Sequence, residues 1–79
     1  MKLEILTPDK RIYKGDVVSV SVPGTKGAFT ILHNHAPIIS TLSRGQIKII
    51  PERSKAEIYN IEGGIVEVKK NNIIVLADL

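Results

Sequence analysis

Two histidines separated by a single residue are the side chains in this sequence best suited to metal chemistry. His33 and His35 flank Asn34, and in an extended segment residues at positions i and i+2 point to the same side. Such a pair could bind Zn²⁺ or Cu²⁺, but a zinc site needs at least three protein ligands. The chain has no cysteine and no third histidine, and its carboxylates are not grouped near this segment. We therefore predict no metal site, and we expect the His35 imidazole to hydrogen-bond local backbone or a partner.

A loop over residues 23–27 contains the residue types found in phosphate-binding loops, namely Pro, Gly, Thr and Lys. However, the eight-residue pattern that ends in Gly-Lys-Ser/Thr is missing, and no helix is expected after the loop to receive a phosphate. Gly24 and Gly27 can adopt positive φ, and Pro23 fixes φ. We therefore expect a tight connection between strands, exposed and rigidly held, where a contact site can lie.

The remaining polar residues do not form a recognisable catalytic set. Ser, Thr, His and Asp are all present, yet no pattern places them in a strained elbow or beside an oxyanion hole. Three carboxylates that could act as general acids or bases are spread over two expected strands: Glu57, Glu62 and Glu67. We predict that the chain is not an enzyme, has no catalytic residues and uses no cofactor.

The net charge of +3 and a predicted isoelectric point near 9.4 leave nucleic acid or an acidic protein as conceivable partners. The 11 Lys and Arg residues are scattered, however, and only two pairs are adjacent: Lys10-Arg11 and Lys69-Lys70. A small nucleic-acid-binding barrel also needs exposed aromatic side chains on which bases stack. Phe29, Tyr13 and Tyr59 are the whole aromatic set, so we predict an ordinary solvated surface and no nucleic-acid partner.

The composition predicts a single strand-rich domain over residues 1–79. The chain has 13 Ile and 7 Val but only one Phe and no Trp, and β-branched residues pack well in strands. No targeting signal is visible, and the longest apolar run is far shorter than the roughly 20 residues that cross a bilayer. We expect any membrane association to depend on a protein partner.

Short apolar stretches alternate with turn signals along the whole chain, as is typical of an all-β sandwich or flattened barrel. We expect nine or ten strands, with no long helix, over residues 3–7, 11–14, 18–22, 29–31, 37–42, 46–50, 55–62, 64–69 and 73–77. Val18, Val20 and Val22 alternate with serines, which predicts that these three valines face the core. Gly63-Gly64 predicts a bulge or a close backbone approach.

Two segments in order resemble the N-terminal domain of the ε subunit of F-type ATP synthases. The first runs from Val20 through the Pro-Gly loop to a His35-Ala36-Pro37 corner. The second comprises Glu62-Gly-Gly-Ile-Val-Glu-Val68 and Asn72-Ile-Ile-Val-Leu-Ala-Asp78. The resemblance covers nearly the whole chain and implies two roughly five-stranded antiparallel sheets.

The resemblance also implies a function. The domain is expected to be a non-catalytic part of the central stalk, or rotor, of a proton- or sodium-translocating ATP synthase. It would bind the γ subunit and rest on the polar loops of the c-ring, so that ion-driven rotation is coupled to ATP synthesis. It would lie peripherally at the cytoplasmic face of the bacterial inner membrane, held there only through the complex. We expect the isolated chain to be a monomer.

Individual positions follow from the same resemblance. The expected c-ring contact comprises Thr25, Lys26, Gly27 and Ala28. The expected γ contact includes Thr7, His35 and Ser40.

The sequence departs from the family pattern at three points. His33-Asn34 stands where relatives commonly have Pro-Gly, although Asn tolerates left-handed backbone better than most residues. Lys26 lies in a loop that is acidic in many relatives, so negative or carbonyl-rich groups are expected opposite it. The sequence stops at Leu79, after the last expected strand, so inhibition by the family's C-terminal helical hairpin is not expected of this chain. The alternative to a stalk subunit is a small β interaction or ligand-binding module with a similar turn pattern.

Overall fold

Eight β-strands and no helix make up the computed structural model, which describes all 79 residues. The strands are β1 (Lys2–Leu6), β2 (Arg11–Val22), β3 (Phe29–Ile31), β4 (Ile38–Leu42), β5 (Gly45–Pro51), β6 (Glu57–Ile61), β7 (Gly63–Lys69) and β8 (Asn72–Asp78). The expected all-β sandwich is thereby confirmed. Nothing in the fold amounts to a helix that could cross a membrane.

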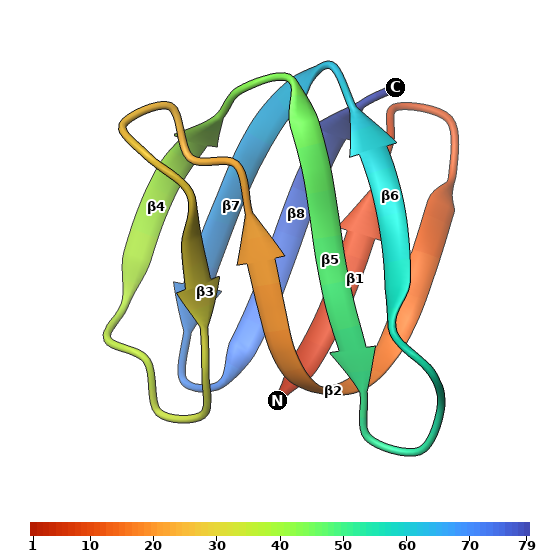
Figure 1. Ribbon diagram of the computed structural model, residues 1–79, viewed down its shortest axis with the longest axis vertical. Coiled ribbons are helices and arrows are strands. Elements are labelled where there is room, and N and C mark those ends of the chain that lie inside the picture. The colour runs from red at the N-terminus through yellow and green to blue at the C-terminus, as the bar shows by residue number, and fades with distance from the viewer.

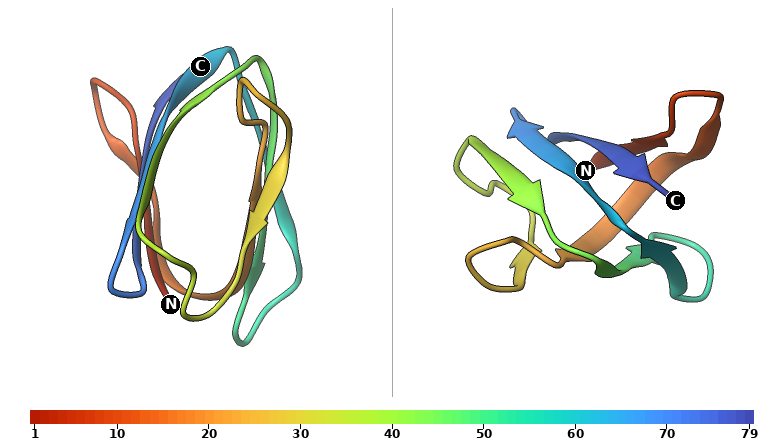
Figure 2. Two further views of the ribbon diagram at one scale, coloured as in Figure 1. Left: turned by 90° about the vertical axis from the view of Figure 1, so that its left-hand side faces the viewer. Right: turned by 90° about the horizontal axis from the view of Figure 1, so that it is seen from above.

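The strands form two layers that face each other (Figures 1 and 2). We call the first the rear sheet; its strand order is β4-β7-β8-β1-β2. The second, or front sheet, contains β3, β2, β5 and β6. Strand β2 belongs to both, because its first half pairs with β1 and its second half pairs with β5 and β3.

The bend in β2 explains two differences from the expected pattern. Residues 11–14 and 18–22 were expected to be separate strands, but they form one strand of 12 residues, so there are eight strands rather than nine or ten. The register of β2 against β5 shifts between Val17 and Ser19, and such a bulge bends a strand and changes which side chains face inward. Val17 is therefore buried, whereas Val18 is 53% exposed. The expectation that Val18 faces the core was wrong, while Val20 and Val22 are buried as predicted.

The rear sheet is not fully antiparallel. Strand β1 pairs with β8 in parallel, with Lys2 opposite Asn72 and Leu6 opposite Leu76. These strands are far apart in the sequence, so no hairpin forces them to run in opposite directions. The expectation of purely antiparallel sheets is corrected at this one pairing.

The hydrophobic side chains buried between the layers are aliphatic, and partly buried Phe29, Tyr13 and Tyr59 pack against them. Because strand residues alternate between faces, each strand contributes every second residue to this core. The 15 buried hydrophobic residues are Leu3, Ile5, Val17, Val20, Val22, Ile31, Leu42, Ile47, Ile49, Ile61, Val66, Val68, Ile73, Val75 and Ala77.

The close backbone approach predicted at Gly63-Gly64 is present at Gly64. This residue has φ of 155°, and a Cβ atom there would lie 2.3 Å from the Leu76 carbonyl oxygen. A side chain at this position would clash with backbone atoms, which cannot move aside easily. Glycine is therefore required where β7 begins to pair with β8.

Candidate protein-interaction surfaces

The loop expected to contact the c-ring lies at one end of the sandwich, between β2 and β3 (Figure 1). All four expected contact residues are exposed: Thr25, Lys26, Gly27 and Ala28. The turn beneath them is crowded, because a Cβ atom at Gly24 would lie 2.6 Å from the Gly27 carbonyl oxygen and 2.9 Å from the Phe29 ring. The loop thus presents its tip to solvent from a tightly packed base.

Backbone hydrogen bonds attach this loop to β4. The Thr25 amide donates to the Thr41 carbonyl at 3.0 Å, and the Ser43 amide donates to the Pro23 carbonyl at 2.7 Å. Gly24 and Leu42 form an isolated antiparallel bridge. The hydroxyls of Thr25 and Thr41 add a bond of 2.7 Å. The loop is therefore an extension of the sheet rather than a mobile segment.

The three residues expected to contact γ lie in three different places. Ser40 is on β4 and shares a hollow with Thr25, Lys26 and Gly27 of the loop just described. His35 lies between β3 and β4, at the opposite end of the sandwich (Figure 1). Thr7 follows β1, which is separated from β4 by β7 and β8. The structure brings Ser40 to the loop, but it does not bring the three residues to one point.

His35 is held by its own segment, as the sequence predicted. Its amide donates to the Leu32 carbonyl at 3.1 Å, and its Nδ1 lies 2.6 Å from the Ala36 carbonyl oxygen. A carbonyl only accepts, so Nδ1 carries the proton and Nε2 remains without a partner in the chain. His33 is exposed, and no group of three or more His, Asp or Glu side chains is gathered anywhere in the structure.

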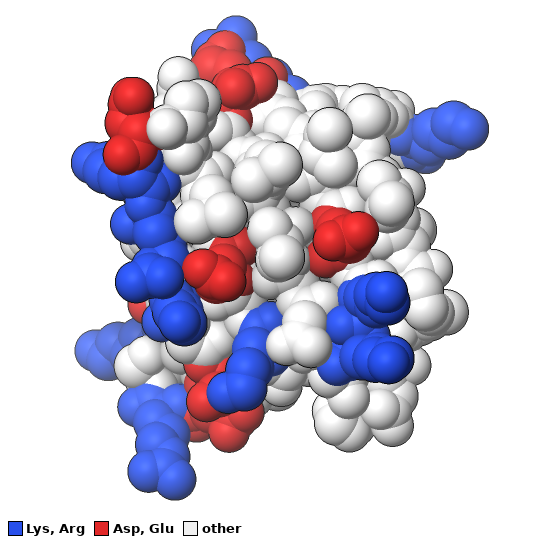
Figure 3. All heavy atoms as spheres, turned by 180° about the vertical axis from the view of Figure 1, so that it is seen from behind, with Lys and Arg blue, Asp and Glu red and all other residues white.

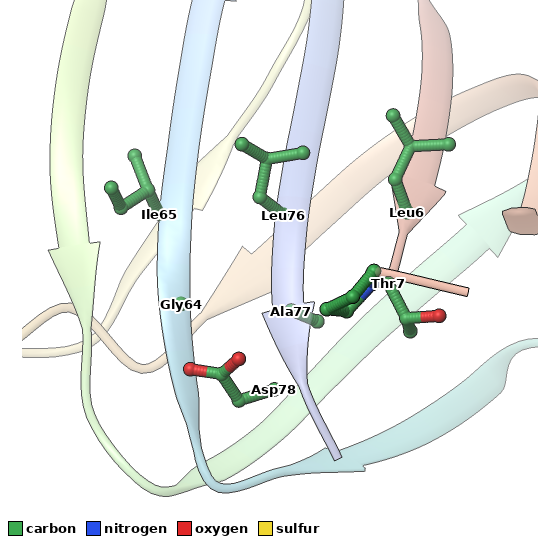
Figure 4. Close-up of a pocket in the computed structure, with 8 residues that line it drawn as sticks. Leu6, Thr7, Gly64, Ile65, Leu76, Ala77 and Asp78 are labelled. Atoms are coloured by element: carbon green, nitrogen blue, oxygen red, sulfur yellow. The ribbon is translucent and has the colours of Figure 1, made fainter. Parts of the chain in front are cut away.

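Thr7 lies beside a row of aliphatic side chains on the outer face of the rear sheet, which the sequence did not single out (Figure 4). Leu6 is opposite Leu76, and Leu76 is opposite Ile65 on the next strand. Leu76 is 51% and Ile65 is 43% exposed. Gly64 and Ala77 leave a shallow hollow next to this row. A signal for it exists in the unbroken apolar run Ile73–Ala77, because a strand that is apolar at successive positions is apolar on both faces.

The aliphatic row forms the centre of an uncharged area bordered by charged groups (Figure 3). In the neighbouring row of the same face, Glu4 and Glu67 lie on either side of Ile74. Glu4 is within 3.5 Å of Arg11, whereas Glu67 takes part in no ion pair. An apolar centre with a charged rim is typical of surfaces that bind other proteins.

The two side chains with shifted pKa values, Tyr13 and Tyr59, meet at an edge of the sandwich. Burial, followed by a hydrogen bond of 2.7 Å to Glu57, raises the pKa of Tyr59 to about 12. Burial, followed by the charge of Glu57, also raises the pKa of Tyr13. The two rings meet edge to face, with centroids 6.3 Å apart. Tyr13 lies in the half of β2 that belongs to the rear sheet, and Tyr59 lies on β6 of the front sheet, so the two rings join the layers at this edge.

Comparisons with known proteins agree with this architecture. The family model of the ATP synthase, Delta/Epsilon chain, beta-sandwich domain matches residues 1–79. An ATP synthase epsilon chain of Leptospira interrogans is 44% identical over 78 residues, which are 99% of this chain and 61% of that protein. An ATP synthase epsilon chain of Chlorobium limicola is 38% identical over 77 residues, which are 98% of this chain and 88% of that protein. The chain thus spans about three fifths of the Leptospira relative.

Two solved structures share the fold. A chain in the Euglena gracilis mitochondrial ATP synthase superposes with a TM-score of 0.87 at 21% identity, covering 95% of this chain and 48% of that one. A chain in the central stalk and c-ring of the Tetrahymena thermophila mitochondrial ATP synthase gives a TM-score of 0.83 at 17% identity, covering 100% and 63%. The family model matches the whole length of the chain, and relatives in two bacterial genera are similar to it. The chain therefore belongs to the ATP synthase delta/epsilon family and is the beta-sandwich domain of that family.

Proposed function

We propose that this domain is a non-catalytic part of the central stalk of a proton- or sodium-translocating ATP synthase, where it joins the γ subunit to the c-ring. The family match over residues 1–79 carries the proposal. The geometry supports it, because the domain offers two paired sheets and a loop that backbone hydrogen bonds fix to β4. A joint that transmits torque should be built on strands and tightly held loops.

The outer face of the rear sheet is the proposed γ-binding surface. Thr7 lies within it, and the row Leu6, Leu76 and Ile65 supplies apolar area that binding would bury. Ser40, on β4, is opposite buried Val66, and His35 lies in the β3–β4 loop beside Phe29. The γ subunit would therefore have to extend from the outer face around the β4 edge to contact all three expected residues. A stable contact of this kind buries on the order of 1,000–2,000 Å² in total.

The loop of residues 25–28 is the proposed c-ring contact. Lys26 is exposed and forms no ion pair in the chain. We infer that it faces acidic side chains or carbonyl groups of the c-subunit loops. The complex then holds the domain at the membrane, which in a bacterium is the cytoplasmic face of the inner membrane.

Co-purification tests the first part of the proposal. The chain is co-expressed with the γ subunit of the same organism, and the complex is isolated through a tag on γ. A one-to-one complex is expected, and Leu76→Asp should weaken it because a charge would be buried in the apolar row. Ile58→Asp is the matched control, since Ile58 is 54% exposed on the front sheet. Failure of the unmodified chain to bind γ would contradict the proposal.

Charge reversal tests the second part. Lys26→Glu in the assembled ATP synthase should reduce ion-driven ATP synthesis, whereas ATP hydrolysis by the detached catalytic head should not change. Lys55→Glu introduces the same charge change in the exposed connection between β5 and β6, at the other end of the sandwich (Figure 1). Equal synthesis rates for the two variants would argue against a c-ring contact at Lys26.

A further inference from the structure

A pair of asparagines joins the corner that carries His35 to the turn between β7 and β8. The Asn34 amide donates to Asn71 Oδ1 at 2.8 Å, and Asn71 Nδ2 donates to Asn34 Oδ1 at 3.1 Å. The two residues are 37 positions apart in the sequence. The Asn71 side chain therefore supplies both an acceptor and a donor, whereas Asn34 contributes its backbone amide as a donor and its side-chain carbonyl as an acceptor.

The backbone at this pair is in an uncommon conformation. Asn34 has φ of 63°, Asn71 has φ of 60°, and Lys70 is the one further non-glycine residue with positive φ. Asn reaches this left-handed region at a lower cost than most residues, because its short polar side chain can hydrogen-bond locally. Here the two asparagine side chains hydrogen-bond to each other's segment instead. Asparagine therefore suits both the left-handed turn and the long-range contact at each position.

Asn71 is also fixed on its other side. Its carbonyl accepts the Lys2 amide at 3.0 Å, at the start of β1. The pair therefore ties the corner to the end of the rear sheet at which β1 and β8 begin. The corner has few other long-range hydrogen bonds, because the bonds of His35 itself go to Leu32 and Ala36.

We propose that Asn34 and Asn71 form an amide lock, which is a positioning device that holds the His35 corner so that Nε2 faces the partner. The role in binding rests on the proposed function, in which His35 contacts γ. Neither asparagine needs to touch γ itself. The lock restricts the conformations of the corner before γ binds, so that less conformational entropy is lost on binding.

Hydrogen–deuterium exchange of the isolated chain tests the lock without any partner. Asn71→Gly keeps the positive φ accessible and removes the side-chain bonds. The Asn34 amide is then expected to exchange about fivefold faster, the value for one net hydrogen bond. Asn60→Ala is the matched control, since it removes an amide pair of the same kind, Gln46 to Asn60 at 3.1 Å, on the front sheet. Unchanged exchange at Asn34 in Asn71→Gly would overturn the lock.

Titration with the γ subunit tests the role of the lock in binding. His35→Ala and Asn71→Gly should each weaken binding several-fold, and the double variant should be no weaker than His35→Ala, because the lock acts through His35. Asn60→Ala should bind as the unmodified chain does. Additive losses, or full affinity of Asn71→Gly beside a weakened His35→Ala, would overturn the positioning role. If the unmodified chain does not bind γ, the proposed function fails together with that role, whereas the exchange result still decides whether the lock exists.

Discussion

The two loops that flank β3 are held in opposite ways. At one end of the sandwich, residues 23–28 are attached to β4 by backbone hydrogen bonds, from Thr25 to Thr41 and from Ser43 to Pro23. At the other end, residues 32–37 are attached to the β7–β8 turn by the side chains of Asn34 and Asn71. Figure 1 shows both loops, one above β3 and one below it.

This difference indicates how freely each loop can change. A loop held by its backbone can vary the side chains at its tip without losing its shape, so Lys26 can suit whatever surface it meets. A loop held by two side chains depends on those two residues. We therefore expect substitutions at Lys26 and Ala28 to change binding alone, and substitutions at Asn34 or Asn71 to change local order as well.

The largest effect is expected at the base of the backbone-held loop. Gly24→Ala places a Cβ atom 2.6 Å from the Gly27 carbonyl oxygen and 2.9 Å from Phe29. Overpacking of this kind costs about 1–3 kcal/mol of unfolding free energy. Urea denaturation measures the loss. Gly27→Ala, which meets no atom within 4 Å but has φ of 133°, should cost less, about 1 kcal/mol. A larger loss of unfolding free energy for Gly27→Ala than for Gly24→Ala would contradict the inference that the base of this loop is its most tightly packed part.

The next effect separates backbone strain from side-chain bonding in the second loop. Both Asn34→Ala and Asn34→Gly lose the bond from Asn71 Nδ2 to Asn34 Oδ1 and keep the backbone amide that donates to Asn71. Alanine must adopt φ of 63°, whereas glycine adopts this φ freely. The alanine variant should be less stable than the glycine variant by about 1 kcal/mol. Thermal unfolding of both variants gives the comparison. Equal stability would mean that the corner does not keep its left-handed turn.

A smaller effect is expected when the hydroxyl bond of the first loop is removed. Thr41→Val deletes the bond of 2.7 Å to Thr25 and keeps both the shape of the side chain and the backbone bonds. An exposed pair of this kind contributes about 0.5 kcal/mol. Amide exchange over residues 24–28 should change little. Strong deprotection of the loop would show that it depends on side chains, as the second loop does.

The prediction with the smallest expected change in stability at neutral pH concerns Tyr59, whose ring packs against Tyr13 at an edge of the sandwich. Its pKa is raised to about 12, so the folded state keeps the phenol proton at a pH where an unfolded tyrosine, with a pKa near 10, has lost it. The contribution of Tyr59 to stability should therefore be constant below pH 10 and fall as the pH rises from 10 to 12. Tyr59→Phe should show a shallower fall in melting temperature over this range. An identical pH profile for both chains would argue that Tyr59 ionises freely in the folded state.

The sequence predicted the parts of the fold that depend on local pattern. Alternation of apolar residues indicated the strands, and Pro23, Gly24 and Gly27 indicated the tight loop. The bulge at Val17–Ser19 and the parallel pairing of β1 with β8 depend on which strands become neighbours, and a single sequence does not specify that. The bond between Asn34 and Asn71 has the same origin, since it joins positions that only the folded sheet brings together.

The sequence likewise predicted some parts of the candidate interaction surfaces and missed others. The exposed loop tip was found from its glycines, and the hydrogen bond of His35 to local backbone was anticipated and is present. The aliphatic row Leu6, Leu76 and Ile65 was missed, because those residues were read as ordinary strand residues. Its outward direction follows from the pairing of three strands, of which β1 is remote in sequence from the other two.

Cross-linking in the assembled ATP synthase tests the central claim most directly. The chain has no cysteine, so a thiol introduced into it is unique and can be labelled before the chain is assembled with its partners. A photoactivatable cross-linker is attached to Leu76→Cys on the rear sheet, to Lys26→Cys on the loop, and to Ile58→Cys on the front sheet as the control. We predict that the first variant links to γ, the second to the c subunit, and the third to neither. Linking of the front-sheet variant to γ, with no product from Leu76→Cys, would contradict the account.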